Sequence, residues 1–238
     1  MDTVQDIIFG LVVGVVPALL WLWFWLKQDK KRPEPKGRLA LTFFGGALAF
    51  LVVLPFEELA WDRISDVATL FIVWACIEEV VKFIFVYFTA LRRRECDEPI
   101  DPMIYMITGA LGFSAIENVF FVIAALNETG AVGGFGAGNM RFIGATLLHV
   151  LASGTVGFFM SLSFYRRKTP KTIFLSIGIA LAVFMHAYFN LGLEEGEGIG
   201  SVAVFSIVWL MLVLLLLAFE KAKRIENPVP DSERGPGA

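Results

Sequence analysis

Long apolar runs alternate with short polar segments along almost the whole chain of 238 residues. Because a helix needs about 20 mostly apolar residues to cross the hydrocarbon core of a bilayer, each run predicts a transmembrane span. Seven spans are expected, at residues 7–26, 39–56, 67–91, 103–126, 142–165, 172–191 and 201–219. The pattern therefore predicts an all-α fold, a polytopic membrane protein built as a bundle of about seven transmembrane helices.

The seven spans leave little chain for a soluble domain. We expect one transmembrane helical domain at residues 1–222 and a disordered cytoplasmic tail at 223–238, where prolines and charges accumulate. The first span has no basic segment before it and no small-residue cleavage site after it. It is therefore expected to be a membrane anchor rather than a signal peptide.

Composition supports a membrane protein. Apolar residues make up 57% of the chain and charged residues only 18%, where a soluble domain has about 25%. This balance argues against a soluble globule, a secreted disulfide scaffold and a disordered chain. The net charge of −3 gives no reason to expect nucleic acid as a partner. The expected surroundings are a lipid bilayer.

The basic residues between the spans predict the orientation. Segments 27–38, 92–94, 166–171 and 221–224 hold six, three, four and three Lys or Arg residues, whereas the intervening loops hold only Arg63 and Arg141. Lys and Arg favour the cytoplasmic side of a membrane. The alternation therefore predicts a multi-pass protein of the cell membrane with an extracytoplasmic N-terminus and a cytoplasmic C-terminus.

Two further segments affect the boundaries. The second span is expected to end near Pro55, so Glu57 and Glu58 are interpreted as part of an interfacial loop. The outer segment 130–138 contains five glycines and is expected to be a flexible linker, with a gate over a site as the sharper alternative.

Several polar side chains lie where lipid should exclude them. A charged side chain at the centre of a spanning helix costs about 2.5–3.5 kcal/mol, so those that remain usually face the bundle interior and have a function. They lie on four successive spans: Glu78, Glu79 and Lys82, then Glu117 and Asn118, then His149, then His186 and Asn190. We expect these side chains to converge on one site.

The residue types fit more than one chemistry. A Glu can activate water as a general base while His or Asn stabilises an oxyanion. The same Glu and His residues can instead bind Zn²⁺ with one position open for water. From spacing alone, hydrolysis and proton-coupled transport both remain open.

The polar residues form four ordered patterns: EEVVK at 78–82, FSAIEN at 113–118, the single His149 and HAYFN at 186–190. These resemble the EExxK, FxxxEN, His and HxxxN motifs of the PrsW intramembrane proteases, a family distantly related to CAAX prenyl endopeptidases and bacteriocin-immunity proteins. The resemblance covers about residues 70–190. Its one departure is Phe189, an aromatic residue where Trp is expected.

The resemblance implies a membrane-embedded endopeptidase with Glu78 as general base and Glu79 and Lys82 as its charge partners. His149 with Glu117 would position the water or a metal, and His186 with Asn190 would stabilise the oxyanion. The full set of expected catalytic residues is Glu78, Glu79, Lys82, Glu117, Asn118, His149, His186 and Asn190.

A metal and a substrate class are also implied. The metal, if used, is expected to be Zn²⁺ held by some of Glu79, Glu117, His149 and His186; a metal-free glutamate mechanism stays open. The expected substrate is a single-pass membrane protein of the anti-sigma-factor kind, cut at a first site near the extracytoplasmic side. An ion-coupled transporter and a non-catalytic chaperone or immunity-type binder are the alternatives.

Overall fold

A computed structural model describes residues 3–28, 32–195 and 199–227 of the chain. Seven α-helices and one π-helical turn follow one another: α1 Thr3–Leu26, α2 Lys36–Trp61, α3 Val67–Val86, η1 Tyr87–Leu91, α4 Asp101–Ile143, α5 Ala145–Leu162, α6 Lys168–Glu195 and α7 Ile199–Ala222. None of the residues in these described ranges forms a strand. The predicted tail lies, from residue 228 onward, outside them.

Six of the helices are long and apolar enough to cross a membrane. The exception is α3, which has 20 residues but carries Glu78, Glu79 and Lys82. The prediction of an all-α, multi-pass membrane protein is confirmed. The charges that disqualify α3 as an ordinary span are the ones that form the site described below.

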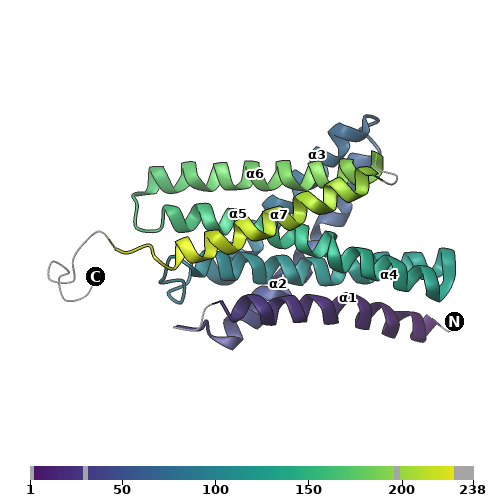
Figure 1. Cartoon of the computed structure of the whole chain (residues 1–238), viewed down its shortest axis with the longest axis horizontal. Helices are drawn as coiled ribbons and strands as arrows, with labels where there is room; N and C mark the ends of the chain where they lie inside the picture. The colour runs from purple at the N-terminus through teal and green to yellow at the C-terminus, as the bar shows by residue number, and fades with distance from the viewer. Residues whose placement is uncertain (1–2, 29–31, 196–198, 228–238) are drawn as a thin grey trace.

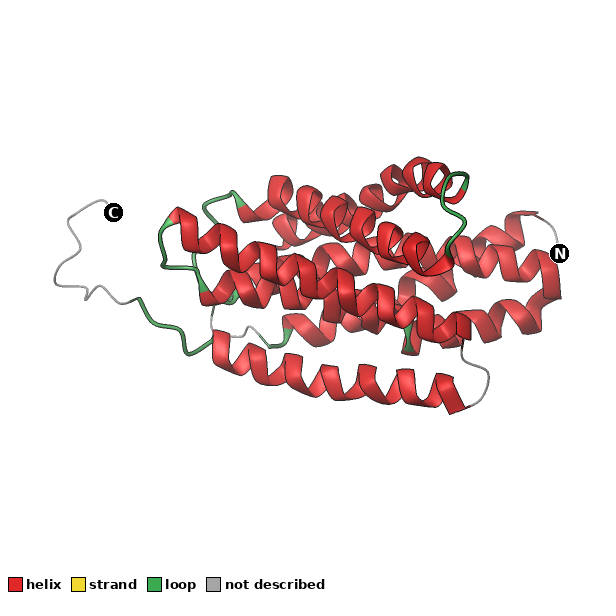
Figure 2. Ribbon diagram, turned by 90° about the horizontal axis from the view of Figure 1, so that it is seen from above, coloured by secondary structure: helices red, strands yellow, loops and turns green. Residues whose placement is uncertain are grey.

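The long helices lie side by side along roughly one axis (Figure 1, Figure 2). The connections from α1 to α2, from α3 to α4 and from α5 to α6 lie at the end of the bundle where α7 ends. The N-terminus lies at the other end (Figure 1). Three of the four basic segments lie in these connections and the adjoining helix ends, and the fourth, 221–224, lies at the end of α7. The basic residues therefore gather at one end, which we call the basic end.

Ion pairs and hydrogen bonds fold the connections of the basic end against the helices. Arg38 donates hydrogen bonds to the Thr89 carbonyl oxygen at 2.9 Å and to Glu95 Oε1 at 2.6 Å. The hydrogen bond from Arg38 lowers the pKa of the Glu95 carboxyl below its ordinary value. Tyr105 on α4 donates a hydrogen bond to Glu34 in the preceding connection.

Helices α4 and α5 form the centre of the bundle. In their apolar stretches 61% and 67% of the residues are buried, against 17% in α1. Every residue from 101 to 115 on α4 is buried, which is typical of a helix surrounded by others on all sides. Helix α4 packs against α1, α2 and α5, and α5 packs against α6.

Three glycines allow α2 and α4 to touch along their backbones. A Cβ atom on Gly46 of α2 would lie 1.9 Å from the carbonyl oxygen of Gly109 on α4. One on Gly112 would lie 1.9 Å from the carbonyl oxygen of Phe43. Small residues at such crossings let membrane helices approach closely, because packing rather than hydrophobic burial holds them together.

Replacing Gly112 with alanine is expected to lower the free energy of unfolding by about 1–3 kcal/mol. The new methyl group would clash with the Phe43 carbonyl, which can move only if the backbone of α2 shifts with it. Unfolding of the purified protein in detergent measures the effect. Gly37→Ala is the matched control, since nothing lies within 4 Å of a Cβ at that position. Equal stability of the two variants would contradict the close crossing.

The structure corrects the predicted end of the second span. Helix α2 runs through Pro55 to Trp61, so the placement of Glu57 and Glu58 in an interfacial loop is wrong. Proline is tolerated inside membrane helices because neighbours satisfy the freed backbone groups. Beyond Pro55, the Trp74 indole of α3 donates a hydrogen bond to the Glu57 carbonyl oxygen at 3.0 Å, which ties the last turns of α2 to α3.

The glycine-rich segment 130–138 also differs from the expectation. Instead of a loop it is part of α4, which continues on both sides of a single non-helical residue, Gly130. The φ of Gly130 is 72°, a left-handed conformation that only glycine adopts without strain. A single residue, Gly130, therefore interrupts the helix, where the sequence predicted a flexible linker of nine residues.

Candidate active site

The site is assembled around α3, which passes between α2, α4, α5 and α6. Asp66 caps the start of the helix, and its carboxylate accepts a hydrogen bond from the Thr69 amide at 2.8 Å. Hydrogen bonds from the Thr69 hydroxyl and amide lower the pKa of the Asp66 carboxyl. Residues 78, 79 and 82 follow on the inward side of α3, and all three side chains are buried.

Lys82 is the hub of the polar cluster. Its ammonium nitrogen lies 2.5 Å from Glu79 Oε1, 3.6 Å from Glu78 Oε2 and 3.0 Å from His149 Nδ1. The ammonium also lies over the ring of Phe113, 4.5 Å from its centroid. Since no part of Lys82 is exposed, the two carboxylates supply the negative charge that its burial requires.

Glu79 holds His186 of α6 in a defined orientation. His186 Nδ1 donates a hydrogen bond to Glu79 Oε1 at 2.9 Å. The other ring nitrogen, Nε2, then faces Glu78 and lies 3.8 Å from its Oε1. A carboxylate that fixes one nitrogen of a histidine and leaves the second for a ligand is a common arrangement at metal and catalytic sites.

Glu117 of α4 interacts with His149 of α5. Because a lysine ammonium can only donate, His149 Nδ1 accepts from Lys82 and the ring hydrogen of the neutral side chain lies on Nε2. Nε2 then donates to Glu117 Oε2 at 2.8 Å. The rings of His149 and His186 meet edge to face, with centroids 5.1 Å apart.

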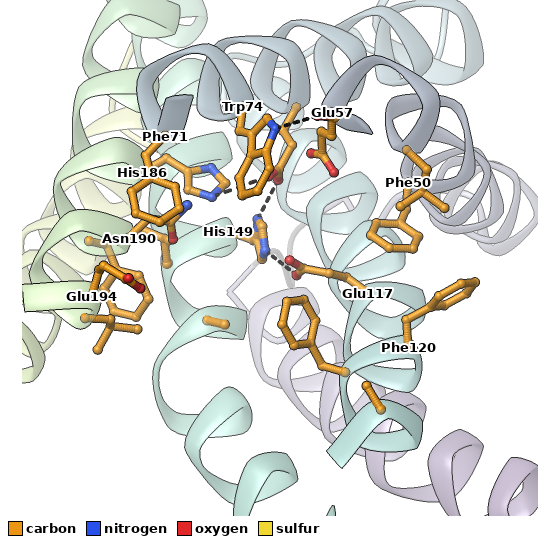
Figure 3. Close-up of a pocket in the computed structure, with 18 of the residues that line it drawn as sticks. Phe50, Glu57, Phe71, Trp74, Glu117, Phe120, His149, His186, Asn190 and Glu194 are labelled. Carbon is orange, nitrogen blue, oxygen red and sulfur yellow. Dashed lines mark hydrogen bonds and ion pairs between the residues drawn. The ribbon is translucent and has the colours of Figure 1, made fainter. Parts of the chain in front are cut away.

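These side chains border a cavity of about 760 Å³ between α2, α3, α4, α5 and α6. Glu78, Glu117, His149, His186 and Asn190 line it. Its walls are otherwise mostly aromatic and aliphatic, and Figure 3 shows His149, His186, Glu117 and Asn190 within this apolar frame. The cavity brings polar reactive groups together with space for an apolar chain.

Two of the predicted residues lie behind the cavity wall, and one lies beside it. Glu79 and Lys82 support the lining residues from within the core. Asn118 donates hydrogen bonds to Thr146 Oγ1 at 2.9 Å and Ser114 Oγ at 3.3 Å, which joins α4 to α5. Its side chain connects two helices rather than facing the reacting groups.

Glu78, His149 and His186 form the group of side chains that could hold a metal ion. One ligand atom from each lies within 4.8 Å of the others, and all three residues are buried. Glu78 Oε2 is buried without a hydrogen-bond partner among the described residues. A carboxylate and two histidines suit Zn²⁺. The geometry favours Glu78 over Glu79 as the carboxylate ligand, because Glu79 Oε1 already binds Lys82 and His186.

The sequence analysis missed Glu57 as a residue of the cavity. It lines the same cavity as Glu78 and Glu117, and its carboxyl group points into it (Figure 3). A signal was present: Gly46, Ala49, Phe50 and Val53 are among the buried positions of α2, and the same spacing continued past Pro55 reaches residue 57.

Comparison with known proteins gives the family. The family model described as PrsW family intramembrane metalloprotease matches residues 34–218. The chain is 28% identical to a protein named Protease PrsW from Geobacillus kaustophilus over 92% of this chain and 93% of the relative. Another from Halalkalibacterium halodurans is 26% identical over 90% and 95%. No solved structure matches the chain. The chain belongs to the PrsW family and is a membrane-embedded protease.

Proposed function

We propose that this protease cuts a single-pass membrane protein near the extracytoplasmic end of its span, in the manner of a site-1 cut of an anti-sigma factor. The observation that carries the proposal is the buried carboxylate of Glu78, which faces a mostly apolar cavity beside two histidines. Membership of a protease family favours hydrolysis over ion-coupled transport, which the same residue types would also fit.

In the proposed reaction Glu78 accepts the proton of the attacking water. Glu78 lines the cavity, so its carboxyl group is placed to meet a water molecule there. A general base within a protein contributes about 10²–10⁴-fold to such a reaction. Lys82, 3.6 Å from Glu78 Oε2, supports the charged carboxylate before the proton arrives.

The other residues bind and orient. Glu79 keeps Nε2 of His186 directed toward Glu78. In the reaction without a metal, His186 carries a proton on both ring nitrogens, so that Nε2–H together with Asn190 stabilises the negative charge that develops on the carbonyl oxygen. Glu117 orients His149 through its hydrogen bond to Nε2. Asn118 acts at a distance by holding α4 and α5 in register.

A zinc ion would be held by Glu78, His149 and His186, and His149 would exchange its contact with Lys82 or with Glu117 for the metal. Such an ion would polarise the scissile carbonyl group and make water more acidic. Glu78 is needed with or without the metal, as a ligand in one case and as a base in the other.

The position of the cut follows from depth. Glu78 lies 11 residues after Val67, where α3 begins at the end of the bundle opposite the basic end. At 1.5 Å per residue this is about 17 Å, close to the midplane of a hydrocarbon core about 30 Å thick. The cavity extends from Glu78 to Glu57 near the end of α2 and to Glu194 near the end of α6, and both of these helix ends lie away from the basic end. With the basic end in the cytoplasm, water would therefore reach Glu78 from the extracytoplasmic side.

The test is cleavage of single-span substrates by the purified protein in vesicles, with the cut mapped by mass spectrometry. We expect the cut at or just outside the extracytoplasmic end of the span, with the cytoplasmic part left in the membrane. A cut on the cytoplasmic flank would contradict the orientation. If none of these single-span substrates were cleaved, the proposed activity would be contradicted.

If the site works with zinc, treatment with a chelator is expected to stop cleavage, and added Zn²⁺ is expected to restore it. Elemental analysis of the protein gives a second readout, with one zinc per chain in the active preparation. Asn190→Ala is the control: it should keep its metal because an oxyanion donor need not be a ligand. An active preparation free of metal would show a glutamate-only mechanism.

A further inference from the structure

Glu57 occupies a defined place on the cavity wall. It lies near the end of α2, and its backbone is tied to α3 by the hydrogen bond from Trp74. Its carboxyl group faces the cavity (Figure 3), whereas the neighbouring Glu58 is exposed and does not line the cavity. Two adjacent glutamates of one helix therefore differ only in the side of α2 on which they lie.

The lining of the cavity is acidic. Four of its lining residues are glutamates, Glu57, Glu78, Glu117 and Glu194, and no lysine or arginine is among the lining residues that the structure describes. The carboxylate of Glu78 faces Lys82, and that of Glu117 accepts a hydrogen bond from His149. The carboxyl group of Glu57 lies within hydrogen-bonding reach of that of Glu78, and none of the ion pairs formed by the described side chains involves Glu57. A cation bound beside Glu57 and Glu78 would offset the repulsion between these neighbouring carboxyl groups.

The walls beside Glu57 suit the side chain of a basic residue. Phe50, Phe71 and Trp74 line the cavity with it, and Trp74 is stacked on Trp61 with ring centroids 6.0 Å apart. Lysine and arginine bury their aliphatic stems against apolar surface and place their charge over aromatic faces. An ion pair is also stronger beside such walls than in bulk water, because the local dielectric is lower.

We propose that Glu57 determines substrate specificity by pairing with a lysine or arginine of the substrate close to the scissile bond. This inference rests on the proposed proteolytic function and names the substrate class of that site. Basic residues are scarce on the extracytoplasmic flanks of membrane spans. A requirement for one next to the cut would therefore restrict cleavage to a small subset of single-pass proteins.

The test uses a matched set of single-span peptides that differ only in one residue next to the mapped cut, as Lys, Gln or Glu. The wild-type enzyme is expected to cleave the Lys peptide with a kcat/KM about tenfold above that of the Gln peptide. Glu57→Gln should remove the preference, and Glu57→Lys should reverse it in favour of the Glu peptide. Glu58→Gln, on the outer side of the same helix, should keep the wild-type ratio.

The outcomes separate this inference from the proposed function. If the wild type cuts none of the peptides, the proteolytic function itself is contradicted. If it cuts all three at equal rates, or if Glu57→Gln lowers every rate by the same factor, specificity does not reside in Glu57. The wild-type series alone decides the first two cases, so the test does not depend on the folding of a variant.

Discussion

Replacing Glu78 with glutamine is expected to lower the rate of proteolysis by about 10³-fold or more while leaving the protein folded in the membrane. Glutamine keeps the size of the side chain but can neither accept the proton of water nor serve as a good ligand for a metal. Single-turnover cleavage of a single-span substrate measures the loss, and the thermal unfolding midpoint in detergent reports the fold.

Glu58→Gln is the matched control for this prediction, because the same change is made on the exposed side of α2. It should leave both the cleavage rate and the unfolding midpoint unchanged. Wild-type activity in Glu78→Gln would remove Glu78 from the chemistry and with it the proposed mechanism. Loss of the folded state in that variant would place Glu78 in the structure instead.

The second large effect concerns stability. Lys82→Met is expected to destabilise the protein by about 3–5 kcal/mol, because it leaves the buried carboxylate of Glu79 without the ammonium group 2.5 Å away. Methionine has a similar length, so loss of packing contributes little. The free energy of unfolding in a mild detergent, followed by circular dichroism, gives the magnitude.

A double-mutant cycle shows whether charge is the cause. Glu79→Gln combined with Lys82→Met should be more stable than Lys82→Met alone, because the uncompensated charge is then gone. Lys223→Met is the control: Lys223 pairs with Glu220 at 2.7 Å on the surface of α7, and its loss should leave unfolding unchanged. Additive effects of the two buried substitutions would contradict the ion pair.

The polar residues of the site could be found in the sequence because a bilayer penalises each of them. Glu117 or His186 stands out in an apolar span, whereas the same residue on a soluble protein would be one of many. Their convergence also follows from the sequence, since four successive spans of one bundle have only one interior in which to place them.

The pairing of these residues could not be predicted. Glu78 and Glu79 are adjacent, so their side chains differ by about 100° around the axis of α3. Which of them binds Lys82 closely and which faces the cavity depends on the rotation of α3 between its four neighbours. The same holds for Asn118, which is adjacent to Glu117 yet points to Thr146 rather than to the cavity.

Glu57 was missed for a different reason. In soluble proteins a proline usually ends or kinks a helix, and the sequence alone gives no sign that Trp74 stabilises the turn after Pro55. The predicted end of the second span near Pro55 therefore excluded Glu57, which α2 carries into the cavity. Ala60, one turn after Glu57, is buried, so this part of α2 still packs against the bundle.

The charges of α3 have a consequence for how the protein is made. A helix with two glutamates and a lysine in its middle partitions poorly into lipid by itself, whereas α2 and α4 on either side of it are apolar enough to insert. Integration of α3 then depends on α4 being synthesised and offering a partner surface during translation. A nascent chain that stops after α3 would leave this helix outside the bilayer, so the residues that cut substrates become assembled only when the later helices have arrived.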